Sequence, residues 1–146
     1  MKHGWNSWEN YWNIHEKVLR FYSIFMQAPK SYTLIRQTEQ YYEIKCTGIL
    51  FQTYSQNLVR VDIRKNITID DKVKSKLRAQ TESYTYSANR PNPDGRNLIR
   101  YCSPHDDHNN FHHKHDFTTN PPQVIALGSD AWPHVGEFLH EVLLTF

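Results

Sequence analysis

The sequence predicts an α+β fold, with an N-terminal amphipathic helix packed on a curved antiparallel β-sheet and a second helix at the C-terminus. Apolar residues recur at three- and four-residue spacing near both ends of the chain. Between these segments they alternate with polar residues, which is the period of a β-strand. A chain of 146 residues is long enough for one core. We therefore expect a single domain over residues 1–146.

The first expected element is a helix that begins near Asn6 and ends before Pro29. Asn6 followed by Glu9 has the form of a capping box, in which the asparagine side chain accepts from early backbone N–H groups. A proline pushes the preceding residue out of helical dihedrals, so Pro29 marks the end. The apolar stripe is expected to be core, and it comprises Trp8, Tyr11, Trp12, His15, Val18, Leu19, Tyr22, Phe25 and Met26.

Three strands are expected next, at residues 32–35, 42–51 and 58–64, because apolar and polar residues alternate there. Gly48 inside the second of them predicts a bulge or bend. In the third strand, we expect the apolar side chains to face the helix and the charged ones to face the other side, where any polar site on the sheet would lie. The apolar set is Val59, Val61 and Ile63, and the charged set is Arg60, Asp62 and Arg64.

The lysine-rich segment 70–78 leaves three possibilities open, a connector, a short helix or an edge strand. A fourth strand is expected through Tyr84 and Tyr86, a turn at residues 91–95, and a fifth strand through Ile99 and Tyr101. Residues 124–127 predict a last short strand or a turn. A final helix, capped by Ser129 or Asp130, carries an apolar stripe formed by Val135, Phe138, Leu139, Val142, Leu143 and Phe146.

Composition argues for a folded chain outside the membrane. Nine tyrosines, seven phenylalanines and four tryptophans argue against disorder, which is usually poor in aromatic residues. No apolar run approaches membrane-spanning length, and the first residues lack the apolar core of a signal peptide. Cys46 and Cys102 are too few for a disulfide framework, so they are interpreted as free thiols. We expect a cytoplasmic location and no membrane partner.

Positive charge is concentrated in the expected sheet. Residues 36–101 contain twelve Lys/Arg and seven Asp/Glu, an excess of five, whereas the rest of the chain contains five and eight, a deficit of three. A basic sheet rich in tyrosine is a plausible surface for a phosphodiester backbone and stacked bases. The alternative is a solvated face held by salt bridges, which explains most surface charge.

Five of the nine histidines lie between His105 and His115, where aspartates and asparagines surround them. Metal binding is one interpretation. The spacings His105-x2-His108 and His113-x-His115 are those of metal ligands, and Asp106 or Asp107 is a candidate third ligand. The sequence lacks a coherent Cys/His motif, and the position of Cys102 argues for a packing role. We therefore expect no metal and no cofactor. A structural role is a further alternative, because partly buried histidines are common.

The third interpretation is metal-independent cleavage of RNA, in which the ribose 2′-hydroxyl is the nucleophile. The protein then has only to move protons, which suits histidine, and to stabilise charge on phosphate, which suits arginine and lysine. The candidate catalytic residues are His105, His113, His115, Arg100 and Lys114. The candidate substrate-binding residues are Tyr84, Tyr86, Tyr101, Arg60 and Arg64. The sequence also leaves open a non-enzymatic nucleic-acid-binding or regulatory protein and a metal-dependent hydrolase.

Three short motifs together resemble the TumE toxins of bacterial type II toxin–antitoxin systems. They are Tyr84-Thr85-Tyr86, Arg100-Tyr101-Cys102-Ser103-Pro104-His105 and His112-His113-Lys114-His115. Cys102 and Ser103 stand where the family pattern has Asp-Asn, and the stretch that carries the motifs, residues 84–117, spans about a quarter of the chain. The resemblance implies a toxin that blocks translation, acts as a ribonuclease and is neutralised by a cognate helix-turn-helix antitoxin. RNA is then the second partner, and a homodimer is left open.

Overall fold

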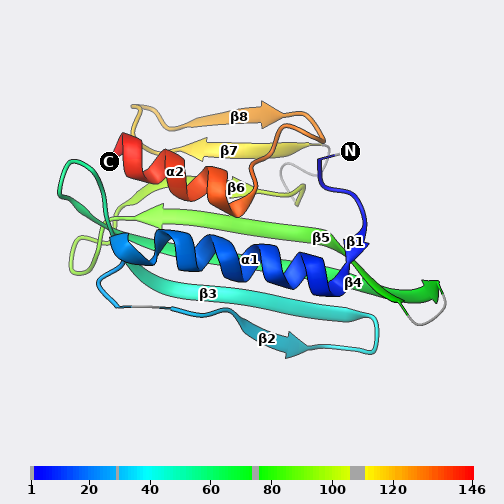
Figure 1. Ribbon diagram of the computed structural model, residues 1–146. Helices are drawn as coiled ribbons and strands as arrows, with labels where there is room; N and C mark the ends of the chain where they lie inside the picture. Colours follow the sequence, from blue (N-terminus) through cyan, green and yellow to red (C-terminus); the bar gives the residue numbers. More distant parts are fainter. Residues whose placement is uncertain (1, 29, 74–75, 106–110) are drawn as a thin grey trace.

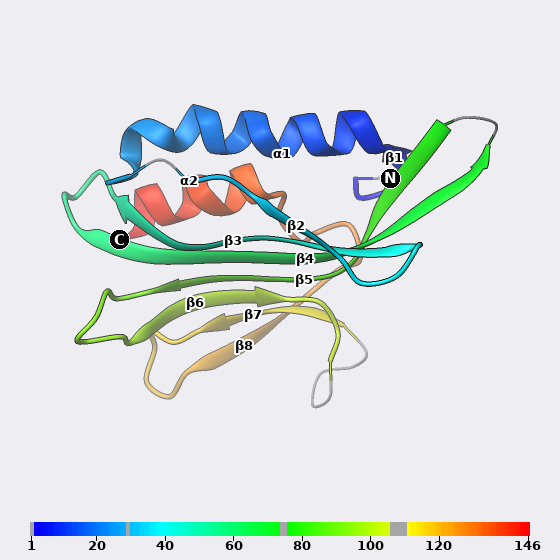
Figure 2. The ribbon, with the colours of Figure 1, turned by 90° about the horizontal axis from the view of Figure 1, so that it is seen from below.

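In the computed structural model, residues 2–28, 30–73, 76–105 and 111–146 are described, and they form one antiparallel sheet with two helices on one of its faces (Figures 1 and 2). The N-terminal elements are β1 (Asn6–Ser7), α1 (Trp8–Tyr22) and the 3₁₀ helix η1 (Ser23–Phe25). The sheet continues with β2 (Thr33–Arg36), β3 (Tyr41–Gln52), β4 (Leu58–Val73), β5 (Lys76–Asn89), β6 (Asn97–Cys102), β7 (His112–Asp116) and β8 (Gln123–Leu127), and α2 (Val135–Thr145) follows.

The strands follow one another in space as they do in the chain. Their order is β2-β3-β4-β5-β6-β7-β8, every neighbouring pair is antiparallel, and β1 pairs with β5. From β2 to β8, each strand therefore lies beside the next strand of the chain, which is the simplest topology for an antiparallel sheet. The predicted α+β fold, with one helix at each end of the chain, is confirmed.

The core lies between the sheet and the helices (Figure 2). Val59, Val61 and Ile63 are fully buried, as their alternation predicts, because alternate residues of a strand point to the same face. Helix α1 contributes Tyr11, His15 and Leu19 to this core. Helix α2 contributes Val135, Phe138, Leu139, Val142 and Leu143, which confirms its predicted apolar stripe.

The helix ends differ from the predicted ones. Ser7, and not Asn6, caps α1, because its side chain accepts from the backbone N–H of Asn10. The α-helix ends at Tyr22, where the 3₁₀ helix η1 begins, so it stops well before Pro29. Helix α2 is capped by His134 in a capping box with Glu137, and not by Ser129 or Asp130.

Two segments are extended where the sequence was ambiguous. The lysine-rich segment is the far end of the β4–β5 hairpin, since β4 runs to Val73 and β5 begins at Lys76. The histidine-rich segment at residues 112–116 forms strand β7. The bulge predicted at Gly48 is confirmed by a register shift between Cys46 and Ile49 and by a positive φ of 70°. There, the Gly48 N–H donates to Asp62 at 2.7 Å.

In the part of the chain that is described, no helix is long and apolar enough to cross a membrane.

Candidate active site on the open face of the sheet

The sheet has two unlike faces. The face toward α1 and α2 is mostly apolar, and among the described residues no helix lies on the opposite face, here called the open face (Figure 2). Side chains that are paired across adjacent antiparallel strands point to the same face. Arg64 pairs with Thr85, and Thr85 pairs with Cys102, which in turn pairs with His113. One row of polar side chains therefore crosses the open face from β4 to β7.

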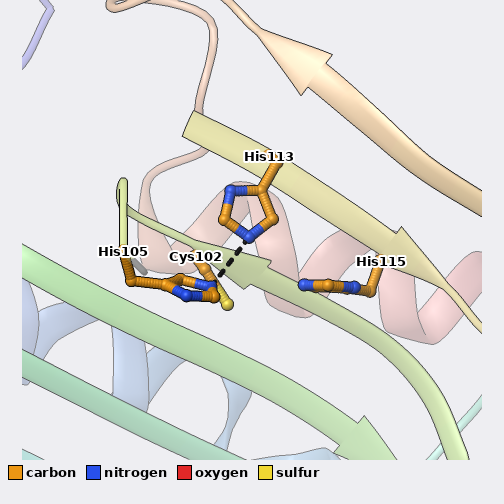
Figure 3. A group of neighbouring side chains, drawn as sticks. All are labelled: Cys102, His105, His113 and His115. Carbon is orange, nitrogen blue, oxygen red and sulfur yellow. Dashed lines mark hydrogen bonds between the residues drawn. The ribbon is translucent and has the colours of Figure 1, made fainter. Parts of the chain in front are cut away.

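Four side chains converge at the end of this row (Figure 3). One ligand-type atom from each of them, an imidazole nitrogen or the thiol sulfur, lies within 4.8 Å of the others. We call this group the histidine cluster, and its members are Cys102, His105, His113 and His115.

Strand pairing brings the cluster together. Strands β6 and β7 pair so that Cys102 lies opposite His113 and Arg100 lies opposite His115. His113 and His115 are two residues apart on one strand, so they share a face, as the sequence predicts for an extended segment. His105 follows the end of β6 and returns its ring to the same place, with its centroid 4.7 Å from that of His113.

Hydrogen bonds define the tautomer of the most buried histidine. His113 is fully buried, and its Nδ1 lies 3.2 Å from the carbonyl oxygen of Phe111. A carbonyl only accepts, so Nδ1–H donates to it and the lone pair of a neutral ring is on Nε2. That Nε2 lies 3.0 Å from Nε2 of His105. In the neutral pair, His105 therefore donates to His113.

Cys102 is the member of the cluster that the sequence assigned to packing. The structure places it on the open face with its sulfur among the imidazoles (Figure 3). Burial raises the pKa of its thiol, while Arg100 and the Thr85 hydroxyl oppose this rise. The thiol is thus protonated near neutral pH and is a weak nucleophile. Its spacing to His105 and the spacing of His113 to His115 were the available signal, Cys-x2-His followed by His-x-His.

A groove of about 490 Å³ leads across the open face to the cluster. Two members of the cluster, Cys102 and His105, line it. Arg64 and Arg100 contribute positive charge to its lining, and Glu43 contributes negative charge. The remaining lining residues are Asn66, Ser83, Tyr84, Thr85, Ser103 and Pro104. We call this the open-face groove.

Four of the predicted site residues point to the other face. Tyr86 is fully buried against Phe138 of α2, and Tyr84 stacks on Trp132 with centroids 4.2 Å apart. Tyr101 donates to Glu141 of α2 at 3.0 Å, and Lys114 pairs with the same carboxylate at 3.1 Å. These side chains contact α2 and the segment that precedes it, and so attach both to the sheet. The position of the three tyrosines indicates a packing role, which is usual for aromatic residues in strands.

Other predicted residues have mixed positions. Arg60 is on the open face beside Asp62, at 3.6 Å, and does not line the open-face groove. Arg100 is on the open face and lies over the ring of Phe117, 5.5 Å from its centroid. Three further candidate metal ligands of the sequence lie outside the described residues, namely Asp106, Asp107 and His108.

A second group of titratable side chains lies on the helix side of the sheet. Lys65 is 3% exposed, and its Nζ is 5.5 Å from the ring centroid of Tyr11. Burial lowers the pKa of Lys65 to about 7. Burial also lowers the pKa of His15 to about 3 and that of His3 to about 4. We call Lys65, His3 and His15 the buried lysine cluster, and a cavity of about 80 Å³ touches all three.

Comparison with known proteins adds no assignment. No protein-family model matches the chain, and no curated protein or solved structure gives a significant match.

Proposed function

We propose that this protein is a translation-blocking toxin of a type II toxin–antitoxin system that cleaves RNA in the open-face groove. The observation that carries the proposal is the convergence of His105, His113 and His115, because His105 lines the same groove as Arg64 and Arg100. Imidazoles move protons near neutral pH, and guanidinium groups bind phosphate through two hydrogen bonds. The resemblance to TumE toxins, carried by the same segments of sequence, supports the cellular role.

The charge of the groove supports the binding of a phosphodiester backbone, since two arginines and one glutamate line it. Arg64 and Arg100 come from β4 and β6, on either side of β5, so together they line a path across the strands. Arginine contacts of this kind position a nucleic acid without reading its sequence. The hydroxyls and the amide that line the groove supply further hydrogen bonds to phosphate, ribose or base edges.

The chemical step proposed needs no group beyond the protein and the RNA. The 2′-hydroxyl attacks the adjacent phosphorus and gives its proton to one imidazole, while the departing 5′-oxygen takes a proton from another. The products are a 2′,3′-cyclic phosphate and a free 5′-hydroxyl. His105 is exposed and lines the groove, and the half-buried ring of His115 lies 6.5 Å from it between centroids, so we assign the two transfers to this pair. His113 is fully buried and positions His105 through their 3.0 Å contact.

Tyr84, Tyr86, Tyr101 and Lys114 are not assigned a contact with RNA, because their side chains face the helices. This weakens the alternative of a non-enzymatic protein that binds bases by stacking on these tyrosines. A cognate helix-turn-helix antitoxin and a cytoplasmic location remain part of the proposal, on the resemblance alone.

The test combines cells and purified protein. Induced expression in a bacterium is expected to arrest growth and reduce protein synthesis, with rescue by the product of the adjacent gene. In metal-free buffer, the purified protein is expected to cleave RNA and leave cyclic phosphate ends. Normal growth at verified expression, together with intact RNA, would contradict the proposal.

A matched pair of variants assigns the activity to the site. His105→Ala is expected to lower cleavage at least about tenfold, since positioned proton transfer contributes about 10²–10⁴-fold. His140→Ala removes an exposed histidine of α2 and is expected to leave cleavage unchanged. Equal cleavage rates of the two variants would show that the histidine cluster does not catalyse the cleavage.

A further inference from the structure

We infer that the histidine cluster is also a binding site for one zinc-type divalent cation, with Cys102, His105, His113 and His115 as its four ligands. Binding of the ion then switches off the proposed RNA cleavage. The metal site stands on its own geometry, whereas the inhibition rests on the proposed function.

The set of donor atoms matches the chemistry of zinc. One thiolate and three imidazoles form a mixed sulfur and nitrogen set, which suits a borderline-soft cation that prefers four-coordinate tetrahedral geometry. Hard cations such as Mg²⁺ and Ca²⁺ prefer oxygen ligands, and the described members of the cluster offer none from their side chains.

The distances match as well. Zinc–nitrogen bonds of about 2.0–2.1 Å and zinc–sulfur bonds of about 2.3 Å place tetrahedral ligand atoms roughly 3.3–3.6 Å apart. His105 Nε2 and His113 Nε2 are already 3.0 Å apart, and all four ligand atoms lie within 4.8 Å of one another. Side-chain rotations that move atoms by about 1 Å therefore close the site around an ion, with no change in strand pairing.

The surroundings of His113 prepare it for a metal. Its Nδ1 donates to the Phe111 carbonyl, and this leaves Nε2 with its lone pair toward the other three ligands. Histidines that bind metals commonly donate their second ring N–H in this way, which fixes the tautomer and the ring orientation. His113 and Cys102 are buried while His105 is exposed, so an ion can enter on the side of His105.

A closed site predicts inhibition and not activation. With all four tetrahedral positions filled by protein atoms, no position is left for water or substrate, which is the pattern of structural and not catalytic zinc. The ion also takes the nitrogen lone pairs that the proposed proton transfers need. Binding releases the Cys102 thiol proton to solvent, since a cysteine ligand must be deprotonated. His105 stays neutral and keeps its ring proton on the nitrogen that does not bind the ion.

Cobalt is the first probe, because Co²⁺ reports its own coordination. Titration of the metal-free protein with Co²⁺ is expected to saturate at one equivalent, with visible bands of a tetrahedral site and a sulfur-to-cobalt charge-transfer band. Zn²⁺ is expected to displace the cobalt. Cys102→Ser should remove the charge-transfer band, whereas Cys46→Ser, the same change at the other buried cysteine, should retain it.

Cleavage of RNA is the second readout. One equivalent of Zn²⁺ is expected to lower cleavage at least about tenfold, since the proton transfers it blocks contribute that much or more, and a chelator should restore it. The metal site is overturned if Co²⁺ fails to bind, or if binding survives both Cys102→Ser and His115→Ala in proteins with unchanged thermal melts. The inhibition is overturned if the metal leaves cleavage unchanged or increases it. A protein that binds cobalt as described but cleaves no RNA when metal-free retains the site and refutes the proposed function.

Discussion

The histidine cluster and the buried lysine cluster contain similar residues on opposite faces of one sheet, yet their surroundings differ. On the open face, three imidazoles and a thiol face one another next to a groove of about 490 Å³. On the helix side, Lys65 and His15 are buried and His3 is half-buried, and burial lowers the pKa of each. The polar atoms of the first group face one another, whereas His3 and His15 of the second group lie against backbone carbonyl oxygens.

The largest expected difference between the two clusters is in activity. His105→Ala is expected to lower RNA cleavage by about 10²-fold and to change stability little, because the side chain is exposed. His15→Ala is expected to leave cleavage unchanged and to destabilise the fold by about 2 kcal/mol, because it opens a cavity beside Tyr11 and Tyr32. Cleavage rates and urea melts of both variants measure this. The reverse pattern would exchange the roles of the two clusters.

Lys65 gives the next largest effect, and it acts on stability. Its folded-state pKa of about 7 lies below the ordinary 10.5, so the unfolded chain binds more protons between these two values. Stability therefore rises with pH across that window, and the penalty for the buried charge is fully present below pH 7. Lys65→Met is expected to stabilise the fold at pH 7 by about 1–4 kcal/mol, with the gain fading as pH approaches 10.5.

Melts of the wild type and of Lys65→Met at several pH values measure this gain. A variant that is less stable than the wild type at neutral pH would show that the contacts of the ammonium with Tyr11, Tyr86 and Trp132 outweigh its burial.

Acid is expected to lower the stability of the fold through protonation of the buried His15. His15 titrates at about 3 in the folded protein and at 6.5 when unperturbed, so the unfolded chain binds more protons between these values. Stability is therefore lost as pH falls through that window, by at most about 1.4 kcal/mol for each pH unit from this one group. Replacement by a residue that does not titrate, in His15→Gln, should flatten the dependence of stability on pH. An unchanged slope would show that His15 is not the group responsible.

The smallest effect distinguishes two arginines of β4. Arg64→Ala is expected to raise KM for RNA about three- to tenfold with little change in kcat. The substitution removes a contact with the RNA phosphodiester backbone that is equally strong in the ground state and the transition state. Arg60→Ala should be nearly neutral, since Arg60 lies outside the groove beside Asp62. Equal effects would indicate that RNA extends past the groove along β4.

Much of the fold follows from local patterns that the sequence displays. The alternation of Val59, Val61 and Ile63 predicted the buried row, and the bulge at Gly48 followed from a glycine within a strand. The helix caps were misplaced because Asn6 and Ser7 are both good capping residues, and only the chain's entry from β1 selects between them. The capping histidine of α2 is uncommon at that position, and Ser129 and Asp130 are better cap residues by propensity.

The site was harder to predict than the fold. Strand β7 has polar residues on both faces, so it lacks the apolar alternation by which a strand is recognised. Without that strand, its register with β6 is unknown, and the register is what brings Cys102 to His113. The same missing information concealed that Lys114 and Tyr101 face α2, although both lie next to cluster residues in the chain.

The two-sided pattern of β7 has a consequence for protein engineering. His112 and Lys114 contact Tyr84 and Glu141 on the helix side, while His113 and His115 face the open side. Because alternate residues of a strand point to opposite faces, the two sets of contacts use different positions. The open face can therefore be redesigned at His113 and His115 while the contacts that attach this strand to the core are kept.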